Sequence, residues 1–483
     1  MENRVLLHGQ GRPDALAMAM NGREVTYREL SWRAESCAYF LRERGIEAGT
    51  PVAIDGENSL AWVYLAHGLF WLGAQIVPLH RGATGEEKEA MVAASGAKTV
   101  FGEKELQGLG ASLQGSLDES LQLGERVAPY QWRLEERVAV FFTSGSTGTP
   151  RGVPLSLDNL VSSAVASADR LGRNEEHHWL CPLALFHIGG YSILSRAAFW
   201  GTSFELLRSF ETEEVWGHLE SGKINGASFV PTMLHRLLKE GTGRVARGLD
   251  VVLIGGGPVN TADLLQARSQ GIPVVPTYGM TESASQIATL APGEGFEKLK
   301  SAGRPLRGAV IKVVDENQEF LPTGTTGRLV IGGPMVVSSY LGEETPKVEN
   351  YFLTSDVGYI DDEGYLFIEH RLGERIVSGG KNIDPLEVEV WLRGSEWIED
   401  ALVSGVDDPE WGQKVVALVR PRKGKDWTRE AQEQLQKEGR ATLSKYKMPK
   451  FFFVVDEFPT TATGKIDRKA AQRLAESFCQ KDL

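Results

Sequence analysis

Residues Val138–Gly152 read VAVFFTSGSTGTPRG, an apolar run followed by glycines and hydroxyl side chains. The first part, Val138–Phe142, is β-branched or aromatic, which is the composition of a buried strand. Glycine, serine and threonine dominate Thr143–Gly152, so the strand is expected to end in a loop. An apolar run ending at a glycine or at Tyr-Gly recurs at Val251–Ile254 and at Val274–Thr277. Such strands, alternating with helices, predict an α/β protein with a largely parallel sheet.

The loop after Phe142 has the chemistry to hold a polyphosphate. Glycines let backbone N–H groups approach an anion, hydroxyl groups add donors, and Arg151 adds positive charge. The spacing G-x-x-x-x-G-K-[ST] of a Walker A loop is absent. A flexible surface loop is the alternative from composition alone. The candidate phosphate-binding residues are Thr143, Ser144, Gly145, Ser146, Thr147, Gly148 and Arg151.

The composition is that of an ordinary globular protein large enough for about three domain-sized units, roughly 150 residues each. The chain has 483 residues, of which 42% are hydrophobic and 24% charged. Its 52 Lys and Arg against 64 Asp and Glu leave a net charge of −12. This balance argues against a general nucleic-acid coat or binding to an anionic membrane surface. An anionic small molecule stays open, because a local cluster of donors can oppose the global charge.

The cysteines and the apolar segments favour a cytoplasmic protein that does not insert into a membrane. Cys37, Cys181 and Cys479 show neither CxxC nor metal-ligand spacing, so a disulfide framework is not expected. The N-terminus lacks the pattern of a signal peptide. The most apolar stretch, Leu60–Gly73, is too short to span a bilayer and holds His67 at its centre, so a buried helix is expected.

Further segments divide the chain into domains. Leu30–Arg44 is expected to be an amphipathic helix, and Pro51–Asp55 a short strand. After about residue 300, short strands are expected at Val310–Val314, Arg328–Ile331 and Tyr365–Glu369, separated by Gly, Pro, Asp and Asn.

These elements predict a large N-terminal domain of parallel-sheet α/β subdomains with a β-rich section, over residues 1–370. Residues 371–374 would be a hinge, and residues 375–483 a small α+β domain with one buried-looking strand at Phe451–Val455. No internal repeat is visible.

Two more motifs follow predicted strands. Gly255-Gly256-Gly257-Pro258 suggests a dinucleotide fingerprint only superficially, because Asn260 stands where a third glycine is needed. Close approach of its backbone to a flat ring stays open. Tyr278–Ser283, YGMTES, could stack a base and hold Mg²⁺ beside a phosphate. Its alternative is an ordinary strand-to-helix turn with a threonine cap.

Together these motifs resemble the adenylate-forming superfamily of acyl- and aryl-CoA synthetases, peptide-synthetase adenylation domains and beetle luciferases. TSGSTGTPRG resembles its phosphate loop, and YGMTES its adenine and magnesium motif. Asp356 stands in the ribose motif, Ser378–Pro385 resembles the loop S-G-G-E-N-I-x-P, and Pro459–Lys469 the segment with the catalytic lysine. The motifs occur in family order over nearly the whole chain.

The resemblance implies an ATP-dependent ligase that uses Mg²⁺ and coenzyme A. Lys465 would bridge the incoming carboxylate and the α-phosphate, and Glu282 would hold the metal. After the acyl-adenylate forms, a mobile C-terminal domain would rotate about Gly373 and present a second loop to the thiol. That loop would include Gly379, Gly380 and Lys381. The further residues that the resemblance assigns to ATP are Gly256, Gly257, Pro258, Tyr278, Gly279, Met280, Thr281, Asp356 and Arg371.

Within the superfamily, three segments resemble the o-succinylbenzoate–CoA ligases of menaquinone biosynthesis. They are LFHIGG from Leu185, ASFVPTMLHRLL from Ala227 and GIPVVPTYGMTESASQIATL from Gly271. This resemblance implies that the acid contacts His187, which also counts among the catalytic residues, and Arg236, Ser283 and Ser285.

Several interpretations stay open beside this one. Arg236 could lie on the solvated face of a helix, His187 could be a satisfied core histidine, and Glu282 could cap a helix. The hinge could be a plain linker. The substrate could be another aromatic or medium-chain acid, or the enzyme could load a carrier protein, and the chain could form a homo-oligomer.

Four residues depart from the family pattern. Arg151 replaces a common lysine, which keeps the charge and changes its geometry. Ser355 replaces a glycine, Ala184 a frequent proline, and Lys381 a common glutamate. None of these changes removes a catalytic group, so an active enzyme is expected.

Replacing Lys465 by alanine tests the role assigned to the lysine. Because the ammonium would act on the carboxylate and the α-phosphate, Lys465→Ala should abolish adenylate formation and spare thiolysis of preformed adenylate. Assays of the two half-reactions measure this, and an equal loss in both would contradict the role.

Overall fold

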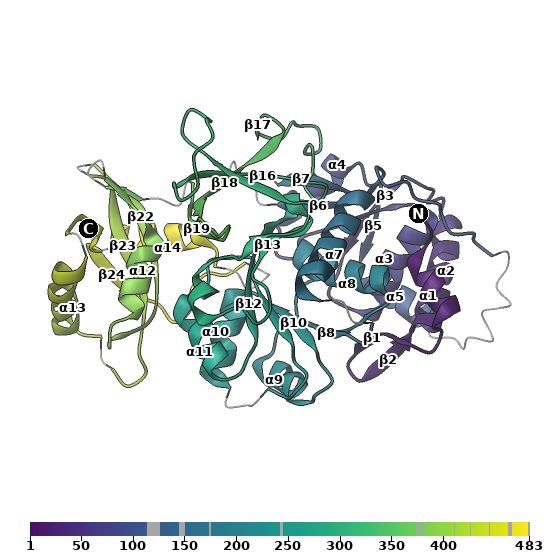
Figure 1. Cartoon of the computed structure of the whole chain (residues 1–483), viewed down its shortest axis with the longest axis horizontal. Helices are drawn as coiled ribbons and strands as arrows, with labels where there is room; N and C mark the ends of the chain where they lie inside the picture. The colour runs from purple at the N-terminus through teal and green to yellow at the C-terminus, as the bar shows by residue number, and fades with distance from the viewer. Residues whose placement is uncertain are drawn as a thin grey trace. The chain divides into compact units, whose positions relative to one another are not determined.

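The computed structural model describes most of the chain (Figure 1). The described ranges are residues 1–113, 126–143, 150–172, 175–241, 245–372, 376–378, 381–409, 411–425, 427–443, 445–461 and 466–481.

A nine-stranded sheet with the order β14-β13-β12-β11-β10-β8-β9-β1-β2 dominates the N-terminal part. The six strands from β12 to β1 in this order are parallel to one another, while β2, β13 and β14 pair in antiparallel fashion. The strands are β1 Leu16–Met20, β2 Arg23–Thr26, β8 His178–Cys181, β9 Ser203–Leu206, β10 Gly226–Phe229, β11 Val251–Ile254, β12 Val274–Met280, β13 Ser285–Thr289 and β14 Arg304–Pro305.

A second sheet has the order β5-β3-β4-β6-β7. Its strands are parallel except β7, which runs antiparallel to β6. The strands are β3 Pro51–Asp55, β4 Gln75–Pro78, β5 Thr99–Gly102, β6 Arg137–Thr143 and β7 Arg151–Ser156. Two largely parallel sheets confirm the predicted α/β class.

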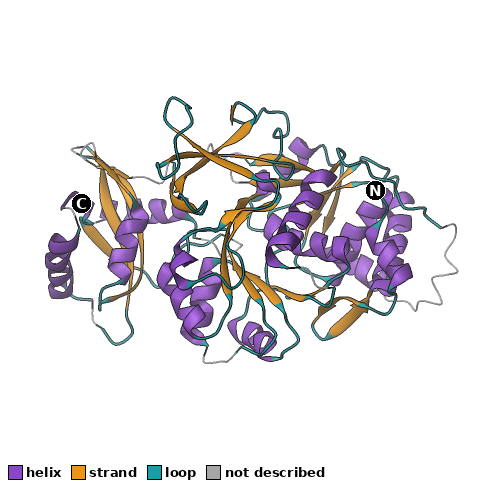
Figure 2. Ribbon diagram, viewed as in Figure 1, coloured by secondary structure: helices purple, strands orange, loops and turns teal. Residues whose placement is uncertain are grey.

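Helices alternate with these strands, as Figure 2 shows. Helix α2 begins three residues before the expected Leu30, because the Thr26 side chain accepts a hydrogen bond from the Glu29 N–H and caps it. The helices are α1 Arg4–Gly11, α2 Tyr27–Arg42, α3 Leu60–Leu72, α4 Gly85–Ser95, α5 Glu103–Ser112, α7 Leu157–Leu171, α8 Ile188–Trp200, α9 Thr212–Glu220, α10 Pro231–Glu240 and α11 Thr261–Ser269, with short 3₁₀ helices η1 Thr281–Ser283 and η2 Phe296–Lys300.

The β-rich section expected after residue 300 is present. It is a sheet with the order β15-β16-β18-β17, in which β19 also pairs with β18. Its strands are β15 Val310–Val314, β16 Gly327–Gly332, β17 Lys347–Val348, β18 Tyr351–Ile360 and β19 Leu366–Arg371.

The C-terminal part is α+β, with the sheet order β21-β20-β23-β22 and β24 parallel to β23. Its elements are β20 Ile376–Ser378, β21 Lys381–Ile383, α12 Pro385–Arg393, β22 Ile398–Asp408, β23 Gly412–Pro421, α13 Arg429–Thr442, η3 Lys445–Lys447, β24 Phe451–Val454 and α14 Arg468–Lys481. The chain forms two compact units. The first comprises Met1–Thr325, Val330–Thr354 and Ile360–Phe367, and the second Thr326–Leu329, Ser355–Tyr359 and Ile368–Leu483.

The strand at Phe451 is less buried than its sequence suggests. Phe451 is 37% exposed and Val454 is 50% exposed, and the described pairing of β24 is with β23 alone. The core of this unit includes Phe452 of β24 and is built largely on β22 and β23, whose long antiparallel pairing was not expected from the sequence.

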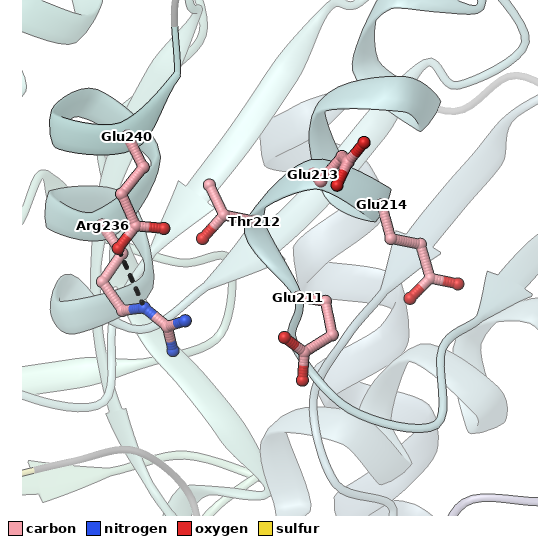
Figure 3. A pocket seen from close by; sticks show the side chains of 6 residues that line it. All are labelled: Glu211, Thr212, Glu213, Glu214, Arg236 and Glu240. Carbon is pink, nitrogen blue, oxygen red and sulfur yellow. Dashed lines mark ion pairs between the residues drawn. The ribbon is translucent and has the colours of Figure 1, made fainter.

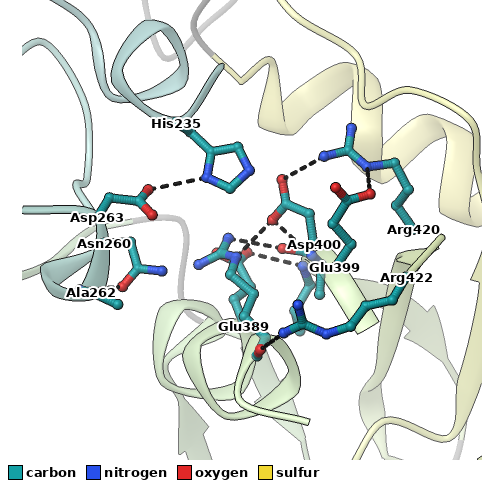
Figure 4. Close-up of polar contacts among 12 residues, drawn as sticks. His235, Asn260, Ala262, Asp263, Glu389, Glu399, Asp400, Arg420 and Arg422 are labelled. Atoms are coloured by element: carbon teal, nitrogen blue, oxygen red, sulfur yellow. Dashed lines mark hydrogen bonds and ion pairs between the residues drawn. The ribbon is translucent and has the colours of Figure 1, made fainter. Parts of the chain in front are cut away.

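A buried carboxylate ties the second unit together. Glu389 on α12 is 1% exposed and accepts hydrogen bonds from Arg468, Arg393 and the Val403 N–H. On the neighbouring strands Arg420 pairs with Glu399 at 3.2 Å (Figure 4). A buried charge is tolerated when it is paired and hydrogen-bonded in this way.

The three cysteines are buried and free, as expected from their spacing. In the described part of the chain, no helix combines the length and the apolar composition that crossing a membrane requires. The apolar stretch from Leu60 forms the buried helix α3, which Ser59 caps and Gly73 ends at φ +85°.

The histidine inside α3 makes folding sensitive to acid. His67 is 7% exposed, and burial lowers its pKa from 6.5 to about 4. The unfolded chain therefore binds a proton below pH 6.5 that the folded chain refuses until about pH 4. Above pH 6.5 His67 is neutral in both the folded and the unfolded chain, so it does not lower the free energy of unfolding. Below pH 6.5 the free energy of unfolding falls progressively with the pH.

We expect His67→Leu to remove part of the acid sensitivity of folding. Between pH 7.5 and pH 5.5, proton uptake by unfolded His67 should lower the free energy of unfolding by on the order of 1 kcal/mol in the wild type. Urea unfolding at the two pH values measures the difference between wild type and variant, with His218→Asn as the control. A pH dependence identical in wild type and His67→Leu would refute the assignment.

Candidate active site

The carboxyl ends of β10, β11 and β12 lie side by side in the parallel sheet. Phe229 pairs with Ile254, and Ile254 with Pro276, so the loops after these strands leave from one edge. The Gly255–Pro258 turn follows β11, and its residues Gly256, Gly257 and Pro258 are exposed. Loops at this edge of a parallel sheet are the usual place for a ligand site.

The turn after β12 differs from the expected strand end. Strand β12 continues through Tyr278 and Gly279 to Met280, and a single 3₁₀ turn then leads into antiparallel β13. The interpretation of Thr281 as a helix cap is therefore wrong, since no α-helix follows. Gly279 is required here, because a Cβ atom would lie 1.6 Å from the Ser285 carbonyl oxygen.

Backbone strain marks the same turn. Ala284 has φ +50° and Ser285 has φ +102°, values that side-chain-bearing residues rarely adopt. The fully buried Ser283 hydroxyl stabilises the turn through hydrogen bonds with the backbone of Met280 and Ser285. These bonds give the hydroxyl a structural role in the turn, and its contact with the acid stays a prediction from the resemblance. Strain fixed by surrounding contacts is typical of functional sites.

Two residues of one segment, Val337 and Tyr340, form hydrogen bonds with Glu282. The Tyr340 hydroxyl donates a hydrogen bond to Glu282 Oε1 at 2.8 Å, and the Val337 N–H donates to the Glu282 carbonyl oxygen at 2.8 Å. Burial and the Glu282 charge raise the pKa of Tyr340, so its phenol stays protonated as a donor. Sequence reasoning missed Tyr340, which lies 58 residues from Glu282 with no local signal to connect them.

Arg151 lies at the base of the predicted phosphate loop and close to the same tyrosine. Antiparallel pairing of β6 and β7 places Thr143 opposite Arg151. The Arg151 guanidinium lies 5.6 Å from the Tyr340 ring centroid and 3.7 Å from Glu343. The structure thus brings together residues of two sequence motifs, the phosphate loop and YGMTES, through Tyr340.

One carboxylate is a sufficient protein contribution to a magnesium site that also uses phosphate oxygens, because Mg²⁺ commonly keeps several waters and few protein ligands. Among the described residues, no group of three or more His, Cys, Asp and Glu side chains could hold a metal by itself. Glu282, held by a neutral donor, fits such a shared site.

His187 stands at the N-cap position of α8 and contacts a second histidine. Its ring centroid lies 5.0 Å from that of His80 and 4.7 Å from that of Phe186. His80 follows β4 of the smaller sheet, and burial lowers its pKa. Sequence reasoning missed His80, which lies two residues after the end of β4, at the carboxyl edge of a parallel sheet where site residues are expected.

The structure favours the solvated-face interpretation of Arg236. The apolar face of α10 is buried as expected, and Arg236 lies on the opposite side, 3.8 Å from Glu240. Figure 3 shows the hollow around it, where a carboxylate would meet repulsion from surrounding acidic groups. The hollow is lined by Glu211, Thr212, Glu213, Glu214, Arg236 and Glu240. The adjacent His235 pairs with Asp263 of α11 at 3.2 Å (Figure 4).

Another arginine, Arg196 on α8, lies among neutral groups near the YGMTES turn. Its guanidinium donates to the Ser167 hydroxyl at 2.8 Å and to the Gln286 side-chain oxygen at 3.0 Å, and lies over the Trp179 ring. Burial lowers its pKa to about 10. Gln286 is on β13 directly opposite Gly279. Sequence reasoning missed Arg196, because its position among the residues of α8 carries no motif.

In the second unit, the structure brings together the two residues predicted on the ribose side. Arg371 Nε lies 3.7 Å from Asp356 Oδ1, and the Leu372 N–H donates to the Ser355 carbonyl oxygen. Lys381 begins β21, and its Nζ lies 4.5 Å from the Tyr446 ring centroid. The predicted residues that lie outside the described ranges are Ser144, Gly145, Ser146, Thr147, Gly148, Gly373, Gly379, Gly380 and Lys465.

The chain belongs to the AMP-binding enzyme family. The AMP-binding enzyme profile matches residues 7–341, and the profile of the AMP-binding enzyme C-terminal domain matches residues 387–465. The chain is 34% identical over 474 residues to a 2-succinylbenzoate–CoA ligase of Geobacillus sp. (strain WCH70), covering 96% of this chain and 95% of that one.

Solved structures of a Bacillus subtilis o-succinylbenzoate CoA synthetase are similar over nearly the full length. The complex with the acyl-adenylate intermediate has a TM-score of 0.86 and 31% identity, covering 97% of each chain. The complex with ATP and magnesium ion has a TM-score of 0.84 and 31% identity, covering 99% of each chain.

Proposed function

We propose that this protein is an AMP-forming 2-succinylbenzoate–CoA ligase that uses ATP, Mg²⁺ and coenzyme A. The observation that carries the proposal is the contact of Tyr340 with both Glu282 and Arg151. It brings together a carboxylate that could bind a metal ion and a cation that could bind a phosphate. The relatives named for 2-succinylbenzoate supply the acid.

The first half-reaction forms a mixed anhydride. A carboxylate oxygen of the acid attacks the α-phosphorus of ATP, the bond to the β-phosphate oxygen breaks, and diphosphate leaves. Two anions must approach one another, so the protein's first task is to stabilise negative charge. Arg151 and the predicted loop would hold the outer phosphates, and Lys465 would bridge the reacting groups. When bound, Mg²⁺ would neutralise charge on phosphate oxygens.

The second half-reaction transfers the acyl group to sulfur. The coenzyme A sulfur attacks the acyl carbon, the bond to the AMP oxygen breaks, and the thiol proton is released. Rotation of residues 375–483 about the hinge at 371–374 would replace Lys465 by the loop that includes Lys381. Asp356 and Arg371, which already form an ion pair, would lie on the ribose side of the nucleotide.

A panel of acids tests this function. Diphosphate release should require ATP and Mg²⁺, and should be far faster with 2-succinylbenzoate than with benzoate, a cinnamate or an octanoate. Added coenzyme A should convert the acid to its thioester, which mass spectrometry detects. Preference for another acid would refute the substrate. No diphosphate release with any acid would leave standing the interpretations that the enzyme loads a carrier protein or that the protein is inactive.

Arg196 supports the choice of acid. 2-Succinylbenzoate keeps a second carboxylate after activation, and this group needs a cationic donor. Arg196 is partly buried, its contacts are with neutral groups, and it lies beside Gln286 behind the YGMTES turn. A buried cation is normally paired with an anion, so these neutral partners suit a site whose anion is the substrate.

We expect Arg196→Met to raise KM for 2-succinylbenzoate by roughly tenfold or more, because a hydrogen bond to a charged group contributes about 1.5–3 kcal/mol. KM for ATP should stay unchanged. Steady-state diphosphate release measures both constants. The matched control is Arg170→Met, since Arg170 on α7 donates to the backbone carbonyls of Thr289 and Pro305. An equal change in both constants, or no change, would remove Arg196 from the acid site.

A further inference from the structure

We propose that Tyr340 is a positioning residue that sets the geometry of Glu282 and Arg151 for a metal–triphosphate. This inference rests on the proposed function and extends it to a residue outside the motifs. Tyr340 is 8% exposed and its side chain contacts both groups, the hydroxyl interacting with Arg151 as well as with Glu282. The hydroxyl bonds the carboxylate, and the ring lies beside the guanidinium.

The hydroxyl holds Glu282 without neutralising it. A tyrosine donor occupies Oε1 and leaves the carboxylate fully charged, whereas an arginine or lysine there would form an ion pair and compete with a metal. The Val337 N–H fixes the backbone of the same residue. With one oxygen and the backbone held, Oε2 is the oxygen available to a cation.

The ring holds Arg151 loosely enough for it to change partners. A guanidinium at 5.6 Å from an aromatic centroid gains a modest cation–π interaction. The ion pair of Arg151 with Glu343 spans 3.7 Å, and the Glu343 side chain is 59% exposed. Exposed pairs of this kind are weak, so a phosphate can take the place of Glu343 while the ring still limits where the guanidinium lies.

The segment Val336–Glu343 keeps Tyr340 in place through its backbone. The Leu341 N–H donates to the Gly152 carbonyl oxygen at 2.9 Å, and the Tyr340 N–H donates to the Glu343 carbonyl oxygen at 3.0 Å. Gly152 permits this approach, because a Cβ atom there would lie 2.7 Å from Leu341 Cδ1. The phenol is therefore positioned before any ligand arrives, which is the arrangement that a pre-organised site requires.

Tyr340→Phe tests the role of the hydroxyl, since the ring and its packing are kept. We expect the Kd of MgATP, measured by isothermal titration calorimetry without acid, to rise by about tenfold. The Kd of ATP in EDTA should stay within twofold of the wild type, because the hydroxyl acts through the metal carboxylate. Tyr351→Phe, at a tyrosine whose ring contacts are with Phe320 and Lys312, is the matched control and should change neither value.

A double-mutant cycle makes the test specific. In the background of Glu282→Gln, adding Tyr340→Phe should have no further effect on MgATP binding. The same loss in both backgrounds, or a Kd of MgATP within twofold of the wild type in Tyr340→Phe, would overturn the proposal. Failure of the wild type itself to bind MgATP would refute the proposed function, and is distinguishable because it precedes every variant.

Discussion

The parallel alignment of β10, β11 and β12 is the constraint on which the site depends. Parallel strands bring their carboxyl ends to one edge, and the loops that follow must leave the sheet there. The glycine turn after β11 and the YGMTES turn after β12 become neighbours for this reason alone. Arg151 comes from the other sheet, so a separate segment is needed to connect it to Glu282, and the residues from Val336 to Glu343 do this.

Much of the fold could be predicted because continuous apolar runs are bounded by residues that favour turns and end helices or strands. The expected Pro51–Asp55, Leu60–Leu72, Val251–Ile254 and Val310–Val314 coincide with β3, α3, β11 and β15. The end of β12 was misplaced, since YGM carries no strand pattern and is extended only by pairing with β13. The burial of β24 was overestimated, because a single apolar run does not reveal how many neighbours cover it.

The site was predictable where chemistry is local and not where it depends on distant contacts. Motifs such as YGMTES hold their residues within a few positions, and their chemistry follows from residue type. Residue type does not distinguish Arg236 from Arg196, because both are arginines on helices. Only the tertiary structure decides what surrounds each of them. The roles of Lys465, Gly373, Gly379 and Gly380 remain predictions from resemblance, since these residues lie outside the described ranges.

A protein with a net charge of −12 can bind a triphosphate and a dicarboxylate only if a few cations are protected from its own acidic groups. Arg236 fails this requirement, because carboxylates surround it and its charge is already compensated. Arg196 meets it because its hydrogen-bond partners are neutral. The fold therefore bears the desolvation of this cation without the compensating energy of an ion pair. Arg151 meets it in another way, through a weak and exposed partner that a phosphate can displace. We therefore propose that Arg151 and Arg196 are suited to bind substrate because the contacts that hold each of them before the substrate arrives are weak or neutral.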